Sequence, residues 1–328
     1  MGARAGGCPE RQGGGGQPEV CRPRGHCSST IHPNGFTLIE LLVVIAAIAL
    51  LMALLVPALS RARRQAKAMV CQARLRQWGT TLALYAQDHE GRFPCNVSGT
   101  AGAWLLRGTL LAVTNKDANA PQDSFYHFRT KDIACCPLAT KCSPAYQNTS
   151  QPGSSPVWFN FPPLSLPGTV GPTYPAWVIW APGPRFVGSY GTNRFLFQPG
   201  FQSTLPSSLP SGGEQEILRL GVDIFSLGSK ANIPVVLDSA APSGGSFSAS
   251  DAPPASLSSS SARWPFCVSR HDDFVNGLFL DWSVRKIGLK ELWKLKWSQD
   301  FNTNGPWTQA GGVKPDKWPP WMRNMKDY

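Results

Sequence analysis

A single carboxylate, Glu40, lies at the start of a long apolar stretch, where a charged side chain is difficult to accommodate. No charged residue follows it from Leu41 to Leu59. A carboxylate that enters a lipid bilayer loses hydration, and such residues are rare there unless they have a partner or a function. The N-terminus of a helix favours negative charge and offsets part of this cost. Glu40 is therefore the first candidate functional residue. The alternative is a glutamate that only stabilises the first helical turn.

The cysteines are a second group with potential chemistry. The chain has nine, and six remain if the segment before the apolar stretch is removed. In an oxidising compartment they would form disulfides. A zinc site usually needs paired CxxC motifs, which the segment ACCPLATKC (134–142) lacks. We therefore predict disulfides here and no metal. The candidate residues are Cys135, Cys136, Cys142 and Cys267.

A third group of titratable residues lies close together in sequence: His271, Asp272, Asp273 and Asp281. Oxygen-rich side chains of this kind could bind Ca²⁺. Aspartate is also an ordinary turn residue, and a hydrogen bond between His271 and Asp281 across a hairpin needs no metal. We favour the hydrogen bond, and we expect neither a metal nor any other cofactor.

The sequence contains no recognisable catalytic motif. It has no glycine-rich phosphate loop, no GxSxG elbow and no HExxH pair, so we expect no enzymatic activity. The formal net charge is +11, and basic chains can bind nucleic acid or anionic lipid. The basic residues gather in 61–76 and 285–296. Neither segment resembles a nucleic-acid-binding module, so we predict no specific nucleic-acid partner.

Helices and strands must position these residues, and the clearest element is the apolar stretch itself. The nineteen residues 41–59 carry no charge, and as a helix they approach the roughly 30 Å thickness of a bilayer core. The apolar region of a secretory signal is shorter. We therefore predict one transmembrane helix over 36–59. Pro57 is expected to kink it, because proline removes a helical hydrogen bond.

The helical pattern continues beyond the apolar stretch as an amphipathic segment over 60–93. Gly91 and Pro94 end it. One helix from about Phe36 to about His89 would therefore serve both the apolar stretch and a following domain. The apolar positions that recur at helical spacing are Ala62, Ala66, Met69, Ala73, Leu75, Trp78, Leu82 and Tyr85.

Residues 94–328 have the pattern of a domain with short strands and long loops. The low-complexity segment 243–262 is expected to be an exposed, disordered loop. A long N-terminal helix packed on an antiparallel β-sheet, an α+β fold, accounts for this order of elements. The predicted strands lie in PAWVIWA (175–181), RFVGSYGTNRFLF (185–197), NIPVVLDSA (232–240) and, as two strands around a turn, DFVNGLFLDWSVRKIGL (273–289).

The segment GFTLIELLVVIAAIALLMALLVPAL (35–59) resembles the N-terminus of type IV prepilins and type II secretion pseudopilins. In that pattern a glycine precedes phenylalanine, a glutamate is the fifth residue after the glycine, and an apolar helix follows. Here these residues are Gly35, Phe36 and Glu40. Pro57 falls where the family often has a helix-bending proline. The resemblance implies a pilin-like fold.

The same resemblance implies how the segment is processed and used. Prepilin peptidase would cut after Gly35, whose missing side chain allows close approach to a protease, and would methylate the new amine of Phe36. In low dielectric, Glu40 would pair with the amine of a neighbouring subunit. This pairing would set the register of subunit assembly.

The C-terminal part is similar to a bacterial pseudopilin subgroup that often has a histidine, nine residues and then Asp-Gly. His271 and Asp281 keep this spacing, but Trp282 replaces the glycine. This departure weakens the expectation of a left-handed turn residue at that position.

The resemblance also implies location and partners. Residues 1–35 would be a cleaved leader, and residues 94–328 would lie in the periplasm or on a cell-surface filament after a single pass through the inner membrane. Partners would be prepilin peptidase, other pilin or pseudopilin subunits, the inner-membrane assembly platform and the lipid bilayer. One charge pattern disagrees with this topology. A basic cluster directly follows the apolar stretch, and positive residues usually stay in the cytoplasm, which would place the C-terminal side there. Anionic lipid or acidic groups on adjacent subunits could instead bind this basic cluster, which consists of Arg61, Arg63, Arg64 and Lys67.

Two functions fit these observations. The first is a structural subunit of a type II secretion or type IV pilus-like filament. The second is a membrane-tethered extracellular binding protein that does not polymerise and uses a tryptophan-rich surface. Glu40 distinguishes them, because a tether does not need it. The tryptophans concerned are Trp158, Trp177, Trp180, Trp318 and Trp321.

Overall fold

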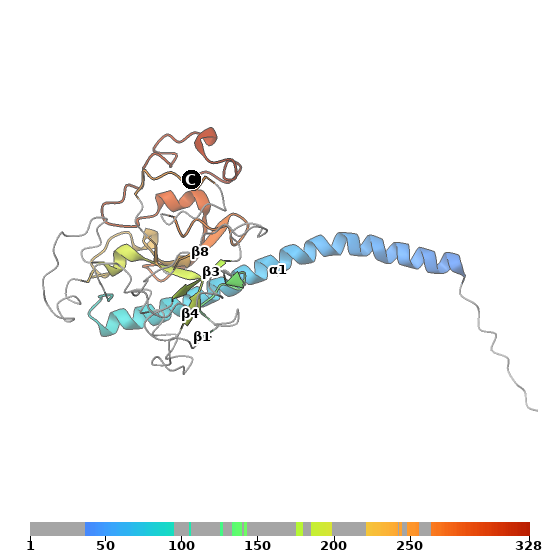
Figure 1. The fold of residues 1–328 in the computed structure, drawn as a ribbon, viewed down its shortest axis with the longest axis horizontal. Helices are drawn as coiled ribbons and strands as arrows, with labels where there is room; N and C mark the ends of the chain where they lie inside the picture. The colour runs from blue at the N-terminus through green and yellow to red at the C-terminus, as the bar shows by residue number, and fades with distance from the viewer. Residues whose placement is uncertain are drawn as a thin grey trace, which may run out of the picture. The chain divides into compact units, whose positions relative to one another are not determined.

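The chain divides into two compact units, Met1–Leu55 and Val56–Tyr328, and helix α1 (Leu38–Asp88) contributes residues to both. Figure 1 shows the fold. The computed structural model describes residues 37–94, 105, 125–126, 133–139, 141–142, 175–179, 185–198, 221–241, 243–244, 248–255 and 264–328.

Helix α1 confirms the long N-terminal helix that the sequence predicts. It ends at Asp88, and the chain then turns through two left-handed residues, Glu90 (φ 55°) and Gly91 (φ 77°). The backbone N–H of Gly91 donates to the carbonyl of Ala86 at 2.7 Å, which satisfies a carbonyl of the last helical turn. Pro57 lies inside α1, and the kink expected there stays a prediction.

In the first unit, the apolar side chains of α1 are exposed. Leu38 is 80% and Leu50 is 67% accessible. Helix α1 is long and apolar enough to cross a membrane, and in the part of the chain that the structure describes it is the one helix that is. Its most apolar window has no residue buried within the chain. Such a surface needs lipid or protein around it.

The second unit contains a five-stranded sheet in the order β7-β5-β6-β8-β9. Four of these strands, β5, β6, β8 and β9, pair antiparallel in sequence order, and β7 joins β5 in parallel. The α+β fold is thus confirmed, with an antiparallel sheet as predicted. The strands are β5 (Tyr190–Asn193), β6 (Pro234–Asp238), β7 (Ser243–Gly244), β8 (Phe274–Phe279) and β9 (Val284–Gly288).

A smaller sheet has the order β1-β4-β3-β2. Its centre is an antiparallel pair, β3 with β4, and the two outer strands join in parallel. Strand β4 leads through Ser189 directly into β5, so the predicted segment 185–197 supplies a strand to each sheet. The strands are β1 (Phe125–Tyr126), β2 (Lys141–Cys142), β3 (Pro175–Ile179) and β4 (Arg185–Gly188).

The second half of α1 buries one face in the domain. Leu75, Trp78 and Leu82 are buried as expected, and Ala68 and Cys71 extend this face toward the N-terminus. The N-terminal part of the predicted apolar stripe is not buried, so this part of the prediction is wrong. Alanine occurs at both exposed and buried helical positions and therefore indicates a buried face poorly. The residues that the structure exposes are Ala62, Ala66, Met69 and Ala73.

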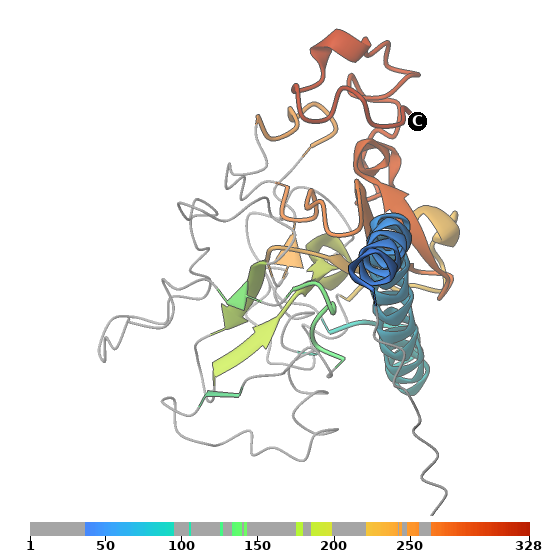
Figure 2. The ribbon, with the colours of Figure 1, turned by 90° about the vertical axis from the view of Figure 1, so that its right-hand side faces the viewer.

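The contact between α1 and the sheet is close. A Cβ at Gly79 would lie 2.9 Å from Leu278 Cδ1 on β8, so glycine allows the helix to approach that strand. The side chain of Gln72 donates to Asn276 Oδ1 of β8 at 2.9 Å. Figure 2 shows the orange strands beside the helix from a second direction.

The C-terminal tail is part of the core. Trp318 is 2% accessible and contacts Trp293 edge to face, with ring centroids 5.5 Å apart. The indole of Trp321 is half-buried and donates to the carbonyl of Pro254 at 2.9 Å. Trp318 is therefore buried and cannot belong to the tryptophan-rich binding surface of the second hypothesis, whereas Trp321 stays partly accessible. Trp158 and Trp180 lie outside the described residues, and Trp177 is in β3.

Part of the predicted disordered loop over 243–262 is also ordered. Residues 243–244 form β7. The indole N–H groups of Trp293 and Trp307 donate to the carbonyls of Asp251 and Ser250 at 3.0 and 3.2 Å. Low complexity does not indicate this order, because the contacts that hold the segment come from tryptophans more than forty residues away.

We expect Gly91→Ala to lower the free energy of unfolding by about 1–2 kcal/mol, because an L-residue pays that cost in the left-handed region. The new Cβ would also meet the Phe225 ring at 2.3 Å. Thermal unfolding of the detergent-solubilised chain measures the change. Gly228→Ala is the matched control, since a Cβ there meets nothing within 4 Å. Equal stability of the two variants would contradict the assigned role of Gly91.

Candidate functional site

The start of α1 forms a capping box around Glu40. The backbone N–H and the hydroxyl of Thr37 donate to Glu40 Oε2 at 2.9 and 2.7 Å. The backbone N–H of Glu40 in turn approaches Thr37 Oγ1 at 3.3 Å. This reciprocal arrangement fixes the first helical turn. Gly35 and Phe36, the predicted processing residues, lie outside the described residues.

The capping box leaves half of the Glu40 carboxylate available. Both bonds from Thr37 end on Oε2, and no described residue donates to Oε1. Glu40 is also exposed. Glu40 thus stabilises the first helical turn, which was the alternative left open by the sequence. This role still allows a second donor from outside the chain to bind the same carboxylate.

His271 and Asp281 are not partners, so the predicted hydrogen bond between them is wrong. Asp281 is exposed and accepts from the backbone and hydroxyl of Ser283 at 3.0 and 2.6 Å. His271 is buried and its Nε2 lies 3.2 Å from Asp238 Oδ2. Sequence spacing suggested a pair across a hairpin, but β6, which carries Asp238, lies next to β8 in the sheet and comes from a distant part of the chain.

The turn between β8 and β9 does use a left-handed residue, although it is not glycine. Trp282 has φ 66°, and its backbone N–H donates to the carbonyl of Phe279 at 2.9 Å. The expectation that tryptophan weakens the need for this conformation is therefore wrong. The Trp282 ring packs edge to face against Phe93, with ring centroids 6.5 Å apart. This packing offsets part of the backbone strain.

The acidic residues beside His271 lie in exposed turns. Asp272 and Asp273 are exposed with φ 53° and 69°, which is turn geometry. Asp272 Oδ2 lies 3.5 Å from Arg64 Nε. Among the residues described here, the side chains grouped closely enough to hold a metal ion are Cys71, Cys136, Asp238 and His271.

The predicted disulfides are absent from the described cysteines. Cys135, Cys136 and Cys267 are buried thiols, and so is Cys71. Burial raises the pKa of the Cys267 thiol above its ordinary range. The side chain of Cys142 lies outside the described residues. Adjacent cysteines could not be paired from sequence because the partners of each are set by the tertiary fold.

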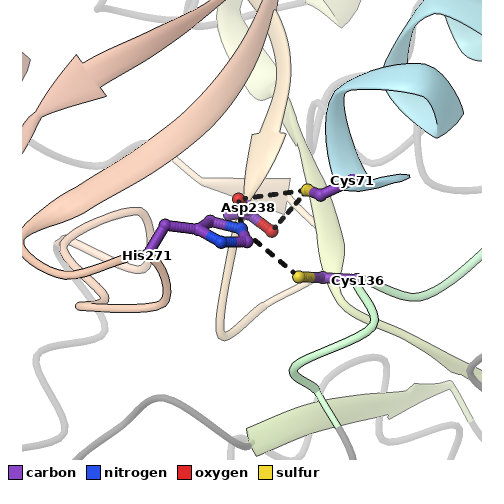
Figure 3. A group of neighbouring side chains, drawn as sticks. All are labelled: Cys71, Cys136, Asp238 and His271. Carbon is purple, nitrogen blue, oxygen red and sulfur yellow. Dashed lines mark hydrogen bonds and ion pairs between the residues drawn. The ribbon is translucent and has the colours of Figure 1, made fainter. Parts of the chain in front are cut away.

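Four buried side chains, Cys71, Cys136, Asp238 and His271, converge on one point (Figure 3). Their potential ligand atoms all lie within 4.8 Å of one another. Cys71 Sγ is 3.5 Å from Asp238 Oδ2, and Cys136 Sγ is 3.4 Å from His271 Nε2. The relative accessibility is 7% for His271 and 0% for the other three.

Each member of this cluster comes from a separate element. Cys71 lies on the buried face of α1, and Asp238 is the last residue of β6. Cys136 lies in the turn 133–139, where its backbone N–H donates to Ser189 Oγ at 2.6 Å. His271 precedes β8, and its backbone N–H donates to the carbonyl of Phe274 at 3.1 Å. The cluster therefore joins segments that are far apart in sequence.

Burial and mutual hydrogen bonds set the charges in the cluster. Burial acts to raise the pKa of the Cys136 thiol, but hydrogen bonds with Cys71 and His271 lower it to about 6. Burial acts to lower the pKa of His271, but Asp238 and Cys136 raise it to about 9. Burial acts to raise the pKa of Asp238, but His271 and Arg270 hold it below its usual value. These directions favour the charged forms of Asp238, His271 and Cys136.

Further groups orient the cluster. The hydroxyl of Tyr190 donates to Cys71 Sγ at 3.3 Å, and the backbone N–H of Asn276 donates to Asp238 Oδ2 at 2.9 Å. Arg270, whose side chain is inaccessible, places Nε 3.8 Å from Asp238 Oδ1. Such groups hold a side chain in one orientation and tune its basicity.

Sequence reasoning singled out Cys136 and His271 but missed Cys71 and Asp238. One signal for Cys71 was available, because it lies one helical turn before Leu75 on the buried face of α1. For Asp238 the signal was a charged residue at the end of the apolar segment PVVL, since buried carboxylates need partners.

Comparison with known protein families gives a match for one segment of this chain. Residues 32–56 match the family described as "Prokaryotic N-terminal methylation motif". The matched residues include Gly35, Phe36 and Glu40. Neither the curated proteins nor the solved structures give a match to the chain.

Proposed function

We propose that this chain, which carries the prokaryotic N-terminal methylation motif, is a pilin-like precursor. It is cut after Gly35, methylated on Phe36, and assembled as a structural subunit of a type II secretion pseudopilus or a type IV pilus-like filament. Such a subunit works through contacts with its neighbours and performs no catalysis of its own.

The observation that carries the proposal is the continuity of the motif with an exposed apolar helix. The motif covers residues 32–56, and α1 begins within it at Leu38. The apolar window of α1 is not buried by the rest of the chain. A surface of this kind suits the bilayer before assembly and the packed helices of a filament core afterwards.

Glu40 adds the specific element. Its carboxylate is fixed by the capping box and keeps Oε1 for another donor. The new amine of Phe36 on a neighbouring subunit would be such a donor, and a charge-assisted bond is strong where water is excluded.

The proposal gives each segment a location. Residues 36–59 cross the inner membrane once, and the domain lies in the periplasm or on an external filament. The exposed basic cluster at the start of the domain, residues 61–67, then faces lipid headgroups or acidic groups of adjacent subunits. The partners are prepilin peptidase, other subunits and the assembly platform.

We expect the mature N-terminus to be an N-methylated Phe36. Mass spectrometry of the chain isolated from its native membranes, combined with sequencing of the N-terminal peptide, measures this directly. Gly35→Leu should leave residues 1–35 attached, because a side chain at this position obstructs the approach to the protease. An intact N-terminus in the unaltered chain, or a cut near Ala58, would refute the proposal.

A further inference from the structure

The potential ligand atoms of Cys71, Cys136, Asp238 and His271 all lie within 4.8 Å of one another, which is close to the spacing of four ligands around one metal ion. For a zinc ion with bonds of about 2.3 Å to sulfur and about 2.0–2.1 Å to nitrogen and oxygen, neighbouring ligand atoms are separated by about 3.4–3.8 Å. The observed separations are 3.5 Å from Cys71 Sγ to Asp238, 3.4 Å from Cys136 Sγ to His271 and 3.2 Å from His271 to Asp238. Two of these three separations fall in the range expected for zinc, and the third is slightly shorter.

The donor set selects the kind of metal. Two thiolates, an imidazole and a carboxylate are ligands of zinc, whereas calcium and magnesium prefer oxygen alone. Four protein ligands with no accessible position indicate a structural site and not a catalytic one. We propose that Cys71, Cys136, Asp238 and His271 bind one Zn²⁺ ion as a closed, four-coordinate structural site.

Charge balance favours this occupant. Two thiolates and one carboxylate supply three negative charges, and the ion supplies two positive charges. Arg270 provides the remaining positive charge from 3.8 Å away, with an inaccessible side chain. The buried site is then neutral as a whole, which avoids the high cost of an uncompensated charge in the protein interior. Tyr190, which donates to Cys71 Sγ, is a typical outer partner of a metal-bound sulfur.

The main competing state is a disulfide between Cys71 and Cys136. A disulfide uses the two sulfur atoms alone, and it gives no reason for a histidine and an aspartate to converge on them. A metal uses all four side chains. The two states differ in the mass of the chain and in the reactivity of its thiols, so they can be separated by experiment.

A bound ion would tie α1 to the sheet. Cys71 and Asp238 are 167 residues apart, and Cys136 and His271 are 135 residues apart. Cross-links over such long loops restrict the unfolded chain strongly, and metal binding contributes directly to folding. The ion would thus fix the soluble half of α1 on the domain while leaving the apolar half available for other contacts.

The test uses the full chain, extracted in detergent without a metal-binding tag. Elemental analysis should give about one zinc per chain, and removal of the metal by a chelator should lower Tm by about 5 °C or more, restored by added Zn²⁺. Co²⁺ in place of zinc should give the absorption bands of tetrahedral cobalt with thiolate ligands. The cobalt spectrum of the unaltered chain decides the matter even if variants do not fold.

Cys71→Ser and Cys136→Ser should each reduce bound zinc by about tenfold or more. Cys267→Ser is the matched control, because Cys267 is also a buried thiol but lies outside the cluster, and it should keep the metal. A Cys71–Cys136 disulfide in the native chain would overturn the proposal. So would the absence of bound metal after reconstitution, or full zinc content in both serine variants. None of these results depends on whether the chain forms a filament.

Discussion

In the proposed filament, Glu40→Gln is expected to exclude this chain from assembly while its N-terminal helix stays intact. Glutamine can take the place of glutamate in a capping box, so the first turn of α1 should keep its bonds to Thr37. Glutamine carries no charge, however, and cannot form an ion pair with the amine of the neighbouring subunit. Loss of one partner of a desolvated charge pair weakens association by about tenfold or more. Immunoblots of sheared or purified filaments against the membrane fraction measure the change.

Thr37→Val is the matched control for this experiment. It removes the hydroxyl of the cap and keeps the Glu40 charge, so it should cost about 1 kcal/mol of helix stability and leave incorporation nearly unchanged. If the Glu40→Gln chain enters filaments as well as the unaltered chain does, Glu40 is only a capping residue. The tethered, non-polymerising alternative would then gain support.

The second large effect is expected at Asp238. Asp238→Asn keeps the shape of the side chain but leaves the charges of Arg270 and His271 without their buried carboxylate. Removal of one partner from a buried ionic group costs roughly 3–5 kcal/mol. Chemical unfolding of the detergent-solubilised chain, followed by tryptophan fluorescence, gives the free energy of unfolding for comparison.

Two arms of this experiment separate the ionic group from the metal. With a chelator present, the variant should still be less stable than the unaltered chain by this amount, because the charges remain buried without any ion. Asp281→Asn is the control, since Asp281 is an exposed turn residue and should change stability by less than about 1 kcal/mol. Equal stability of Asp238→Asn and the unaltered chain would show that the buried charges are not coupled in the folded state.

The two predictions concern different halves of α1 and different physical problems. The Glu40 carboxylate is not covered by the rest of the chain, and in an apolar environment its charge needs a partner from outside the chain. At Asp238 the carboxylate is fully buried and its partners are all internal. One helix therefore joins an exposed apolar segment to a domain with a buried group of charged side chains.

Much of the fold follows from local patterns. The uncharged stretch after Glu40 specifies the long helix, and Gly91 specifies its end, because these signals depend on neighbouring residues alone. The antiparallel strands β5, β6, β8 and β9 of the main sheet were also predictable, since their apolar runs are bounded by turn residues, but β7 was not. Low complexity at 243–262 was a poor guide, because order there comes from Trp293, Trp307 and Trp321, which are distant in sequence.

The sequence by itself determined the N-terminal motif, the membrane-length helix and the α+β class, because spacing along one continuous segment encodes each of them. Only the tertiary structure decided the partners of the polar residues. Cys71, Cys136, Asp238 and His271 meet because a helix, a turn, the end of β6 and the segment before β8 converge on one point. It also separated His271 from Asp281 and buried Trp318. Side-chain contacts between distant segments depend on how the elements pack, and no periodicity within a single segment records that packing.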